Sequence, residues 1–189
     1  MNQCQETLEN ARATRAATVV LSQCRAFLAH VSPEVYTCRC EAMFGSTIGQ
    51  HVRHALDHFS AVLTALDGEI IDYDDRERQT PVESDVGAAA SRIESLLQRL
   101  GALTEDRDGS TVRVRVMLDS DGTEAVLGST LARELAFAAH HAVHHQAMIT
   151  TIAQEQGLRV PEGFGKAPST RKHERDAGEC ASLVKPGRA

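Results

Sequence analysis

Apolar residues recur every three or four positions in four long stretches of the chain, which is the spacing of helices that bury one face. The first stretch covers residues 7–29 and ends before a Ser–Pro pair. The second covers residues 47–66. It opens with Thr47 and has Gln50 three positions later, the pattern of a capping box. The sequence therefore predicts two long amphipathic helices in its first third.

Two further helices follow. The third is predicted over residues 84–100, beginning at Ser84 or Asp85, and the fourth over residues 129–156. Ser129 or Thr130 is a suitable N-cap residue for the fourth helix, and Gly157 is a suitable stop. Before the fourth helix, valine alternates with arginine over residues 112–116, and an Asp–Gly turn follows that segment. This pattern predicts a short β-hairpin over residues 112–126.

The fold class that follows is all-α: a four-helix bundle with a small β-hairpin inserted between helices three and four. We expect one domain over residues 1–170 and a disordered tail over residues 171–189. Phe164 is a rare aromatic residue within a Gly- and Pro-rich segment, residues 161–170. We therefore expect this segment to fold back over the bundle with Phe164 buried.

Composition narrows the classes of protein. Hydrophobic residues make up 42%, aromatic residues only 4%, and the net charge is −6 with the basic residues scattered. A nucleic-acid-binding protein usually carries a clustered basic face, so this class is not expected. No apolar run reaches the ~18 residues of a membrane helix, and the first residues lack a signal-peptide pattern. We therefore expect a cytoplasmic protein that does not bind membranes.

The five cysteines are odd in number and contain no CxxC pair, which favours reduced thiols over a disulfide framework. The Cys38–Arg39–Cys40 triplet is the alternative, as a metal or redox pair. The five are Cys4, Cys24, Cys38, Cys40 and Cys180.

Seven of the nine histidines fall in two short stretches, each within a predicted helix. They are His51, His54 and His58 in helix two, and His140, His141, His144 and His145 in helix four. At ~100° per residue, His145 and His141 lie ~40° and ~80° from the centre of the apolar stripe of helix four, whereas His144 and His140 lie ~140° and ~180° away. His141 and His145 are one turn apart, so both rings can reach one ion.

A purely structural histidine cluster is the alternative interpretation. Burying two neutral imidazoles without partners costs a few kcal/mol, and a shared metal removes that cost. In helix two the three histidines occupy one side, beside the apolar stripe. By angle alone His51 and His58 lie nearer the core than His54, so periodicity does not select His54.

Two motifs resemble the DinB/YfiT-like superfamily of metal-dependent proteins. The first, Thr47 to Asp57, contains Thr–Ile–Gly and a histidine six positions after the isoleucine, followed by an acidic residue. The second, His141 to Gln146, is similar to the HxxHH or HxxxH pattern of the family's last helix. The resemblance covers about residues 7–157. The family's Arg–Gly–Gln after the last histidine is absent, since Gln146–Ala147–Met148 stands there.

The resemblance implies a four-helix bundle with three histidine ligands, which by the match are His54, His141 and His145. His51 and His58 remain alternates. Three neutral histidines leave a coordination position open, as in catalytic metal sites. Imidazole ligands suit zinc or nickel, with copper or iron as further candidates. Asp57 and Glu134 are candidate catalytic groups for proton transfer or ligand orientation.

The expected function is a metal-dependent enzyme in which the metal activates a thiol or water for transferase or hydrolase chemistry. The superfamily includes transferases that use low-molecular-weight thiols, so the expected partner is a small molecule of that kind. The alternative is a non-catalytic metal-binding stress or interaction protein. The exposed edge of the hairpin favours a homodimer.

Overall fold

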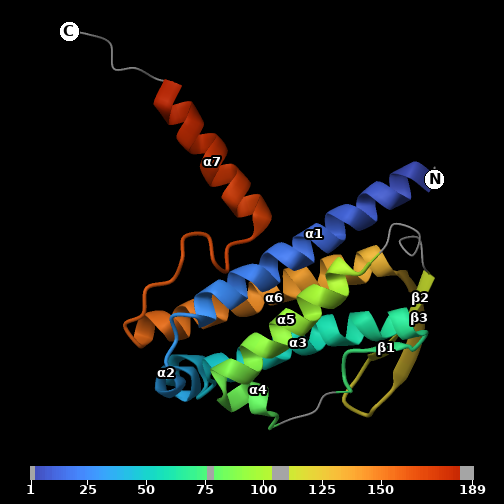
Figure 1. Cartoon of the computed structure of the whole chain (residues 1–189), viewed down its shortest axis with the longest axis horizontal. Coiled ribbons are helices and arrows are strands. Elements are labelled where there is room, and N and C mark those ends of the chain that lie inside the picture. The colour runs from blue at the N-terminus through green and yellow to red at the C-terminus, as the bar shows by residue number, and fades with distance from the viewer. Residues whose placement is uncertain (1–2, 76–78, 104–110, 184–189) are drawn as a thin grey trace.

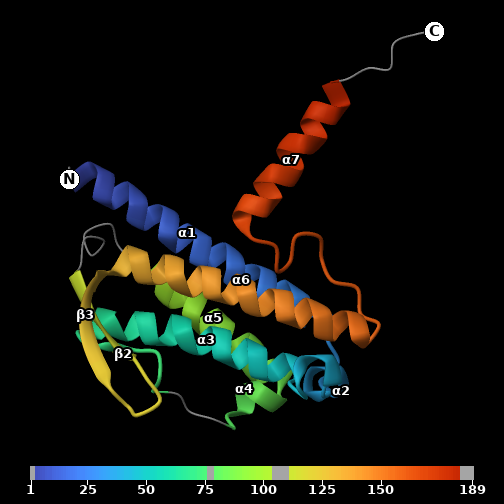
Figure 2. The ribbon, with the colours of Figure 1, turned by 180° about the vertical axis from the view of Figure 1, so that it is seen from behind.

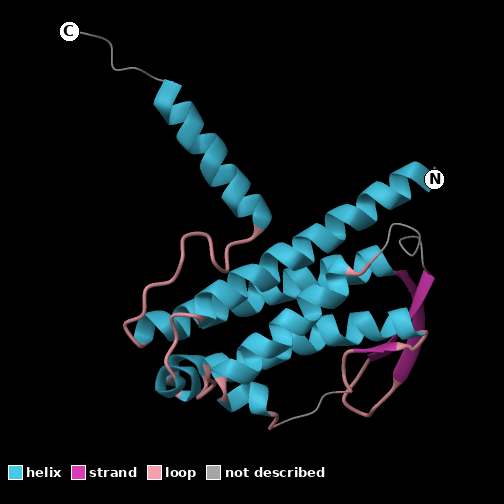
Figure 3. Cartoon of the chain, in the orientation of Figure 1, coloured by secondary structure: helices cyan, strands magenta, loops and turns pink. Residues whose placement is uncertain are grey.

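A computed structural model describes residues 3–75, 79–103 and 111–183 of the chain. Its main body consists of four long helices with a small sheet at one end (Figures 1 and 3). The long helices are α1 (Gln3–Leu28), α3 (Ile48–Thr64), α5 (Val86–Gly101) and α6 (Leu131–Glu155). They correspond to the four predicted helices within a few residues at each end. The predicted helical fold is confirmed in this coarse form.

The long helices pack side by side around an apolar core. Helix α6 contacts α1 on one side and α3 on the other, and α5 contacts both α1 and α3. Figure 2 shows α6 lying between α1 and α3 when the molecule is seen from behind. The core is built mainly from aliphatic side chains, with Phe27, Tyr36 and Phe59 as its largest fully buried aromatic members. This agrees with the low aromatic content of the sequence.

Short elements close the end of the bundle where α3 begins. They are α2 (Pro33–Thr37), the 3₁₀ turn η1 (Glu41–Met43) and α4 (Pro81–Ser84). Tyr36 is fully buried and donates its hydroxyl to the carbonyl of Val82 at 2.7 Å. A Cβ on Gly49 would lie 2.0 Å from the carbonyl oxygen of Glu83. The glycine of the Thr–Ile–Gly motif is therefore required because α4 lies directly against α3.

Side-chain caps fix where the two histidine-bearing helices begin. Thr47 accepts from the backbone N–H of Gln50, whose side chain accepts from the backbone N–H of Thr47, so the predicted capping box is confirmed. Thr130 accepts from the backbone N–H of Arg133 at the start of α6. Each cap satisfies a backbone N–H that would otherwise lack an acceptor in the first turn of its helix.

The sheet has three strands in the order β1-β2-β3, namely Ile71–Asp72, Thr111–Met117 and Glu124–Thr130. Strands β2 and β3 are antiparallel, with Thr111 opposite Thr130, and correspond to the predicted hairpin. Strand β1 pairs parallel to β2, with Ile71 opposite Val114. This third strand was not predicted, because two residues are too short to show an alternating pattern. The 3₁₀ turn η2 (Ala65–Asp67) connects α3 to β1.

The segment after α6 returns to the bundle, as predicted. Phe164 is buried and stacks on Phe27 with ring centroids 4.9 Å apart. Gly165, at φ 74°, lies so close to the backbone of α6 that a Cβ would meet the amide nitrogen of Ala147 at 2.6 Å. Helix α7 (Pro168–Leu183) then extends away from the bundle (Figure 1) and includes the described part of the tail predicted over residues 171–189. Proline is favoured in the first turn of a helix, and Arg, Lys, Glu and Ala then favour its continuation.

Among the described helices, none has the length and apolar character needed to cross a membrane.

Candidate metal centre

Helices α3 and α6 bring five histidine rings together on the side where they face each other. His51, His54 and His58 come from α3, and His141 and His145 come from α6. Neighbouring rings lie with their centroids 3.9–5.2 Å apart. Helical spacing predicted that His141 and His145 face inward, and the family resemblance implied a histidine of helix two beside them, although the two stretches are more than 80 residues apart.

Three ring nitrogens lie in series at the centre of the cluster. Nε2 of His141 lies 3.1 Å from Nε2 of His54 and 3.1 Å from Nε2 of His145. Two imidazole nitrogens that bind one ion at about 2.0–2.1 Å with a near-tetrahedral angle lie roughly 3.3 Å apart. Each of the two observed separations is close to that spacing. The structure thus brings together the three histidines implied by the resemblance.

A second set of three overlaps this one. His54, His58 and His141 each offer one ring nitrogen, and these nitrogens all lie within 4.8 Å of one another. Nδ1 of His58 lies 3.0 Å from the backbone carbonyl oxygen of His54, to which it can only donate. That hydrogen bond leaves Nε2 of His58 as the nitrogen with a lone pair. This group could hold a metal ion, and His58 is a serious alternate ligand.

Hydrogen bonding alone satisfies the central contacts poorly. Each nitrogen of a neutral imidazole carries either one proton or one lone pair. Nε2 of His141 faces two other Nε2 atoms, so a single proton or lone pair on it serves only one of the two contacts well. A cation at the shared centre would make every lone pair a ligand. The donor set, neutral imidazole nitrogens from two rigid helices, fits a divalent transition metal.

Burial keeps the inner rings in the neutral state that metal ligation requires. The pKa of His145 is lowered to about 2, mainly by burial and further by the neighbouring histidines, with His141 and His54 contributing most. The pKa of His51 is also lowered, first by burial and then by His144. Both rings therefore retain lone pairs at neutral pH.

The helix faces agree with the angles calculated from the sequence. His145 is 7% exposed, whereas His140 and His144 are exposed on the outer side of α6. On α3, His58 is 6% exposed, and His51 and His54 are half-buried. His54 and His141 are both half-buried.

Glu134, one of the two candidate catalytic carboxylates, is completely buried next to the cluster. Its carboxylate accepts from the Tyr73 hydroxyl at 2.5 Å, the Ser129 hydroxyl at 2.5 Å and the Arg133 guanidinium at 2.8 Å. The Tyr73 ring stacks on His58, with centroids 4.9 Å apart and planes 18° apart. Glu134 therefore anchors the aromatic ring that packs against the cluster.

Sequence reasoning missed Tyr73. Its only signal was an aromatic residue within an acidic loop. Burial raises the pKa of the Tyr73 phenol, and the hydrogen bond to Glu134 raises it further. The phenol therefore stays protonated and donates to Glu134.

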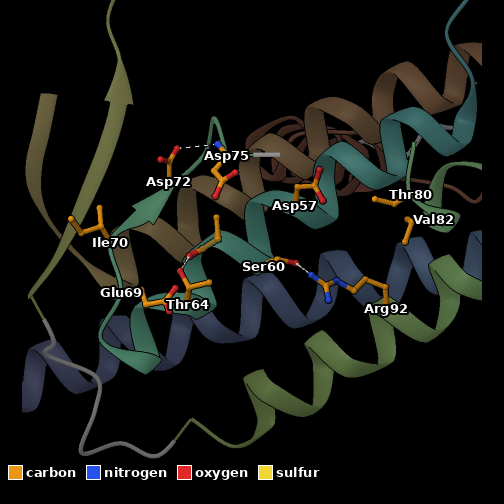
Figure 4. A pocket seen from close by; sticks show the side chains of 11 residues that line it. Asp57, Ser60, Thr64, Glu69, Ile70, Asp72, Asp75, Thr80, Val82 and Arg92 are labelled. Atoms are coloured by element: carbon orange, nitrogen blue, oxygen red, sulfur yellow. Dashed lines mark hydrogen bonds between the residues drawn. The ribbon is translucent and has the colours of Figure 1, made fainter. Parts of the chain in front are cut away.

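Asp57, the other candidate carboxylate, lies in a separate cleft. It pairs with Arg53 at 2.5 Å, and the same guanidinium contacts Glu83 at 2.5 Å. The cleft has a volume of about 360 Å³ and contains Asp57, Ser60, Thr64, Asp72 and Arg92 among its lining residues (Figure 4). None of the histidines is among the eleven residues that line it. The structure does not bring Asp57 into the histidine group.

None of the cysteine side chains that the structure describes forms a disulfide bond. Cys24, Cys38 and Cys40 are free thiols, and Cys40 donates to a carboxylate oxygen of Glu155 at 2.9 Å. Burial raises the pKa of Cys24 to about 12. The side chains of Cys4 and Cys180 lie outside the described residues. Reduced thiols, the predicted state, are what the structure describes for these three.

Comparison with known proteins identifies a family whose match includes the histidine cluster. The model of the DinB superfamily matches residues 7–149, which is more than half of the chain and includes all five clustered histidines. The chain belongs to the DinB superfamily. The resemblance inferred from the two motifs is thereby confirmed.

A similar curated protein is FK506-binding protein 5 of Rhizopus delemar, which is 35% identical over 105 residues. The aligned part is 55% of this chain and 27% of that protein, so the chain matches only about a quarter of that relative's length. No solved structure matches the chain.

Where this DinB chain departs from the family pattern, the structure supplies a role. Gln146 follows the last histidine directly and is 3% exposed. Its side-chain amide donates to the backbone carbonyl of Val20 at 3.1 Å, which ties α6 to α1. Gln146 therefore serves the packing of the bundle on the side of α6 that faces α1.

Proposed function

We propose that this DinB protein binds one divalent transition metal, zinc or nickel in first place, through Nε2 of His54, His141 and His145. The observation that carries the proposal is the pair of 3.1 Å separations that join these three nitrogens. His58 is the alternate for one of the three, because its Nδ1 is engaged with the His54 carbonyl and its Nε2 carries the lone pair. Copper and iron are further candidates, since imidazole suits them as well.

We propose further that the site is catalytic and acts on a small molecule, with a low-molecular-weight thiol as one reactant. Three protein nitrogens leave a position open, and a metal bound there would lower the pKa of a thiol or a water. The half-buried rings of His54 and His141 support an opening toward solvent on that side. Phe137, 36% exposed and stacked on His141 at 5.9 Å, supplies an apolar wall beside it. Transferase or hydrolase chemistry fits this arrangement.

The second candidate function is a non-catalytic metal-binding stress or interaction protein. The burial of His58 and His145 favours this function, because buried ligands are typical of a structural metal site and not of a catalytic one. The 360 Å³ cleft described above also lies apart from the histidines. The two functions differ in whether an exogenous thiol reaches the metal.

We also propose that the four long helices form the DinB type of four-helix bundle and that the chain forms a homodimer. The pairing of α6 with both α1 and α3 supports the first point. Support for the second comes from the hairpin, in which β3 is the last strand in the sheet order. Four of its apolar side chains are 49–62% exposed: Met117 of β2, the following Leu118, and Val126 and Leu127 of β3. Light scattering that reports a monomer at all concentrations would refute the proposed homodimer.

The test of the proposed function has two stages. The purified protein is stripped with a chelator and titrated with zinc and with nickel, and elemental analysis counts the metal retained. We expect one equivalent per chain. The loaded and stripped proteins are then assayed for conjugation of a low-molecular-weight thiol to 1-chloro-2,4-dinitrobenzene. Conjugation only by the loaded protein supports the enzyme, metal binding without conjugation of any thiol supports the second candidate, and no metal binding refutes both.

A further inference from the structure

A line of hydrogen bonds leads from the loop before α3 to the centre of the histidine cluster. The hydroxyl of Ser46 contacts the backbone carbonyl oxygen of Met43 at 2.7 Å and Nε2 of His51 at 3.0 Å. Nδ1 of His51 then contacts Nδ1 of His145 at 3.0 Å. Nε2 of His145 is the atom that faces His141. Four groups are thus connected in series.

The carbonyl of Met43 sets the direction of this series, because a carbonyl oxygen can only accept. The Ser46 hydroxyl gives its proton to Met43, so its oxygen accepts from Nε2–H of His51. The Nδ1 of His51 is then without a proton and accepts from Nδ1–H of His145. Nε2 of His145 is left with a lone pair, directed at the point where the other nitrogens converge.

The opposite direction of these hydrogen bonds would prevent His145 from binding a metal through Nε2. A Ser46 hydroxyl that donated to His51 would place the His51 proton on Nδ1 and the His145 proton on Nε2. The proton on Nε2 would then point at His141, and His145 could not bind a metal through that atom. The Met43 carbonyl would also lose its hydroxyl donor. Whether His145 can bind a metal through Nε2 therefore depends on which acceptor the Ser46 hydroxyl donates its proton to.

The loop is built to hold Ser46 in place. The backbone N–H of Ser46 also donates to the Met43 carbonyl at 3.0 Å, and the Cys40 N–H donates to the Ser46 carbonyl at 3.1 Å. Phe44 and Gly45 both adopt left-handed backbone conformations, at φ 55° and φ 72°, and reverse the chain between Met43 and Ser46. These backbone bonds place the Ser46 hydroxyl beside the Met43 carbonyl, to which it donates.

We propose that His51 is a positioning residue, held by Ser46 and Met43, that keeps His145 in the tautomer with its proton on Nδ1 and its Nε2 free to bind the metal. This inference rests on the proposed metal site and assigns His51 a role other than ligand. Hydrogen bonds of this kind from a second residue fix the orientation and tautomer of ligating histidines, and their loss costs 10–100-fold in metal affinity.

The first test measures zinc affinity by competition with a chromophoric chelator. His51→Ala is expected to weaken binding about 10–100-fold while one equivalent still binds at saturation. His51→Gln should recover most of the loss, because its amide oxygen can accept from Nδ1–H of His145. Ser46→Ala should weaken binding by a smaller factor. His140→Ala, an exposed histidine of α6, is the matched control and should bind like the wild type. Circular dichroism checks that each variant is folded.

The second test reads the tautomers directly by long-range ¹H–¹⁵N NMR of the imidazole rings in the metal-free protein. We expect the Nε2–H tautomer at His51 and the Nδ1–H tautomer at His145, with a mixture at both in Ser46→Ala. Wild-type affinity in His51→Ala, an absence of rescue by His51→Gln, or the Nε2–H tautomer at His145 would each overturn the inference. The expected tautomers in a wild-type protein that binds no metal would instead refute the proposed function and leave the hydrogen-bond order standing.

Discussion

Helix α3 contributes to two polar regions that differ in how their groups are satisfied. At the acidic cleft, the one lined by Asp57, the described contacts join groups of complementary kind: Asp57 pairs with Arg53, Arg53 with Glu83, and Arg92 donates to the hydroxyl of Ser60. In the histidine cluster, by contrast, nitrogens of the same kind face one another at 3.0–3.1 Å. The contacts of the first region need no ion, whereas those of the second would gain from a cation among the nitrogens.

The comparison shows that polar residues in a cleft do not by themselves mark a functional site. Asp57 and Glu134 are both acidic residues near histidines in sequence, yet one balances an arginine and the other is enclosed by three donors. What distinguishes the cluster is that ring nitrogens from two helices face one another at 3.0–3.1 Å.

The largest effect is expected from His145→Ala, which removes a buried ligand from the centre. Metal binding should be abolished, since the remaining two nitrogens of the proposed set hold an ion weakly. His140→Ala on the same helix should keep a full equivalent, because its ring faces solvent. Elemental analysis after dialysis measures both. Loss of metal in His140→Ala but not in His145→Ala would reverse our assignment of the helix faces.

Zinc itself should stabilise the wild-type protein. At about 100 times its dissociation constant, a ligand that binds only the folded state adds about 2.7 kcal/mol, which for a chain of this size raises Tm by roughly 5–10 °C. Differential scanning calorimetry of stripped protein with and without zinc measures the shift. His145→Ala should show little or none. An equal shift in that variant would mean that zinc binds elsewhere.

Glu134→Gln should destabilise the fold without removing the metal. Three donors converge on the carboxylate, and an amide nitrogen in its place leaves at least one of them without an acceptor. The expected cost is about 1–3 kcal/mol in the free energy of unfolding, measured by urea denaturation. Glu124→Gln, at an exposed glutamate of β3, is the control and should change little. A variant as stable as the wild type would argue against Glu134 as an anchor.

The smallest effect is expected from Asp57→Asn in the acidic cleft. It removes the charge that pairs with Arg53, which retains Glu83 as a partner. We expect a loss of about 0.5–1 kcal/mol in stability and unchanged zinc affinity. Chelator competition and urea denaturation are measured on the same preparation. A zinc affinity of Asp57→Asn ten times weaker than that of the wild type would show that the cleft and the metal centre are coupled, and would contradict the distinction between the two regions.

The sequence was sufficient for the parts of this molecule that depend on local periodicity. The four long helices, the Thr47 capping box and the inward faces of His141 and His145 follow from spacing along the chain, whereas the choice of His54 as their partner came from the resemblance to the family. Tyr73, which directly follows β1, meets Glu134 only in three dimensions, because 61 positions separate the two residues, and no local pattern reveals that contact. The direction of the Ser46–His51–His145 series depends on a backbone carbonyl, which is invisible in the sequence.

The central claim is that one metal binds at the convergence of His54, His141 and His145. X-ray absorption at the zinc edge of protein loaded with one equivalent tests it most directly. We predict three imidazole nitrogens at about 2.0–2.1 Å and no sulfur. A sulfur at about 2.3 Å would place the metal at Cys38 or Cys40, and a shell of oxygen atoms without imidazole would place it in the acidic cleft. Either result would contradict the account.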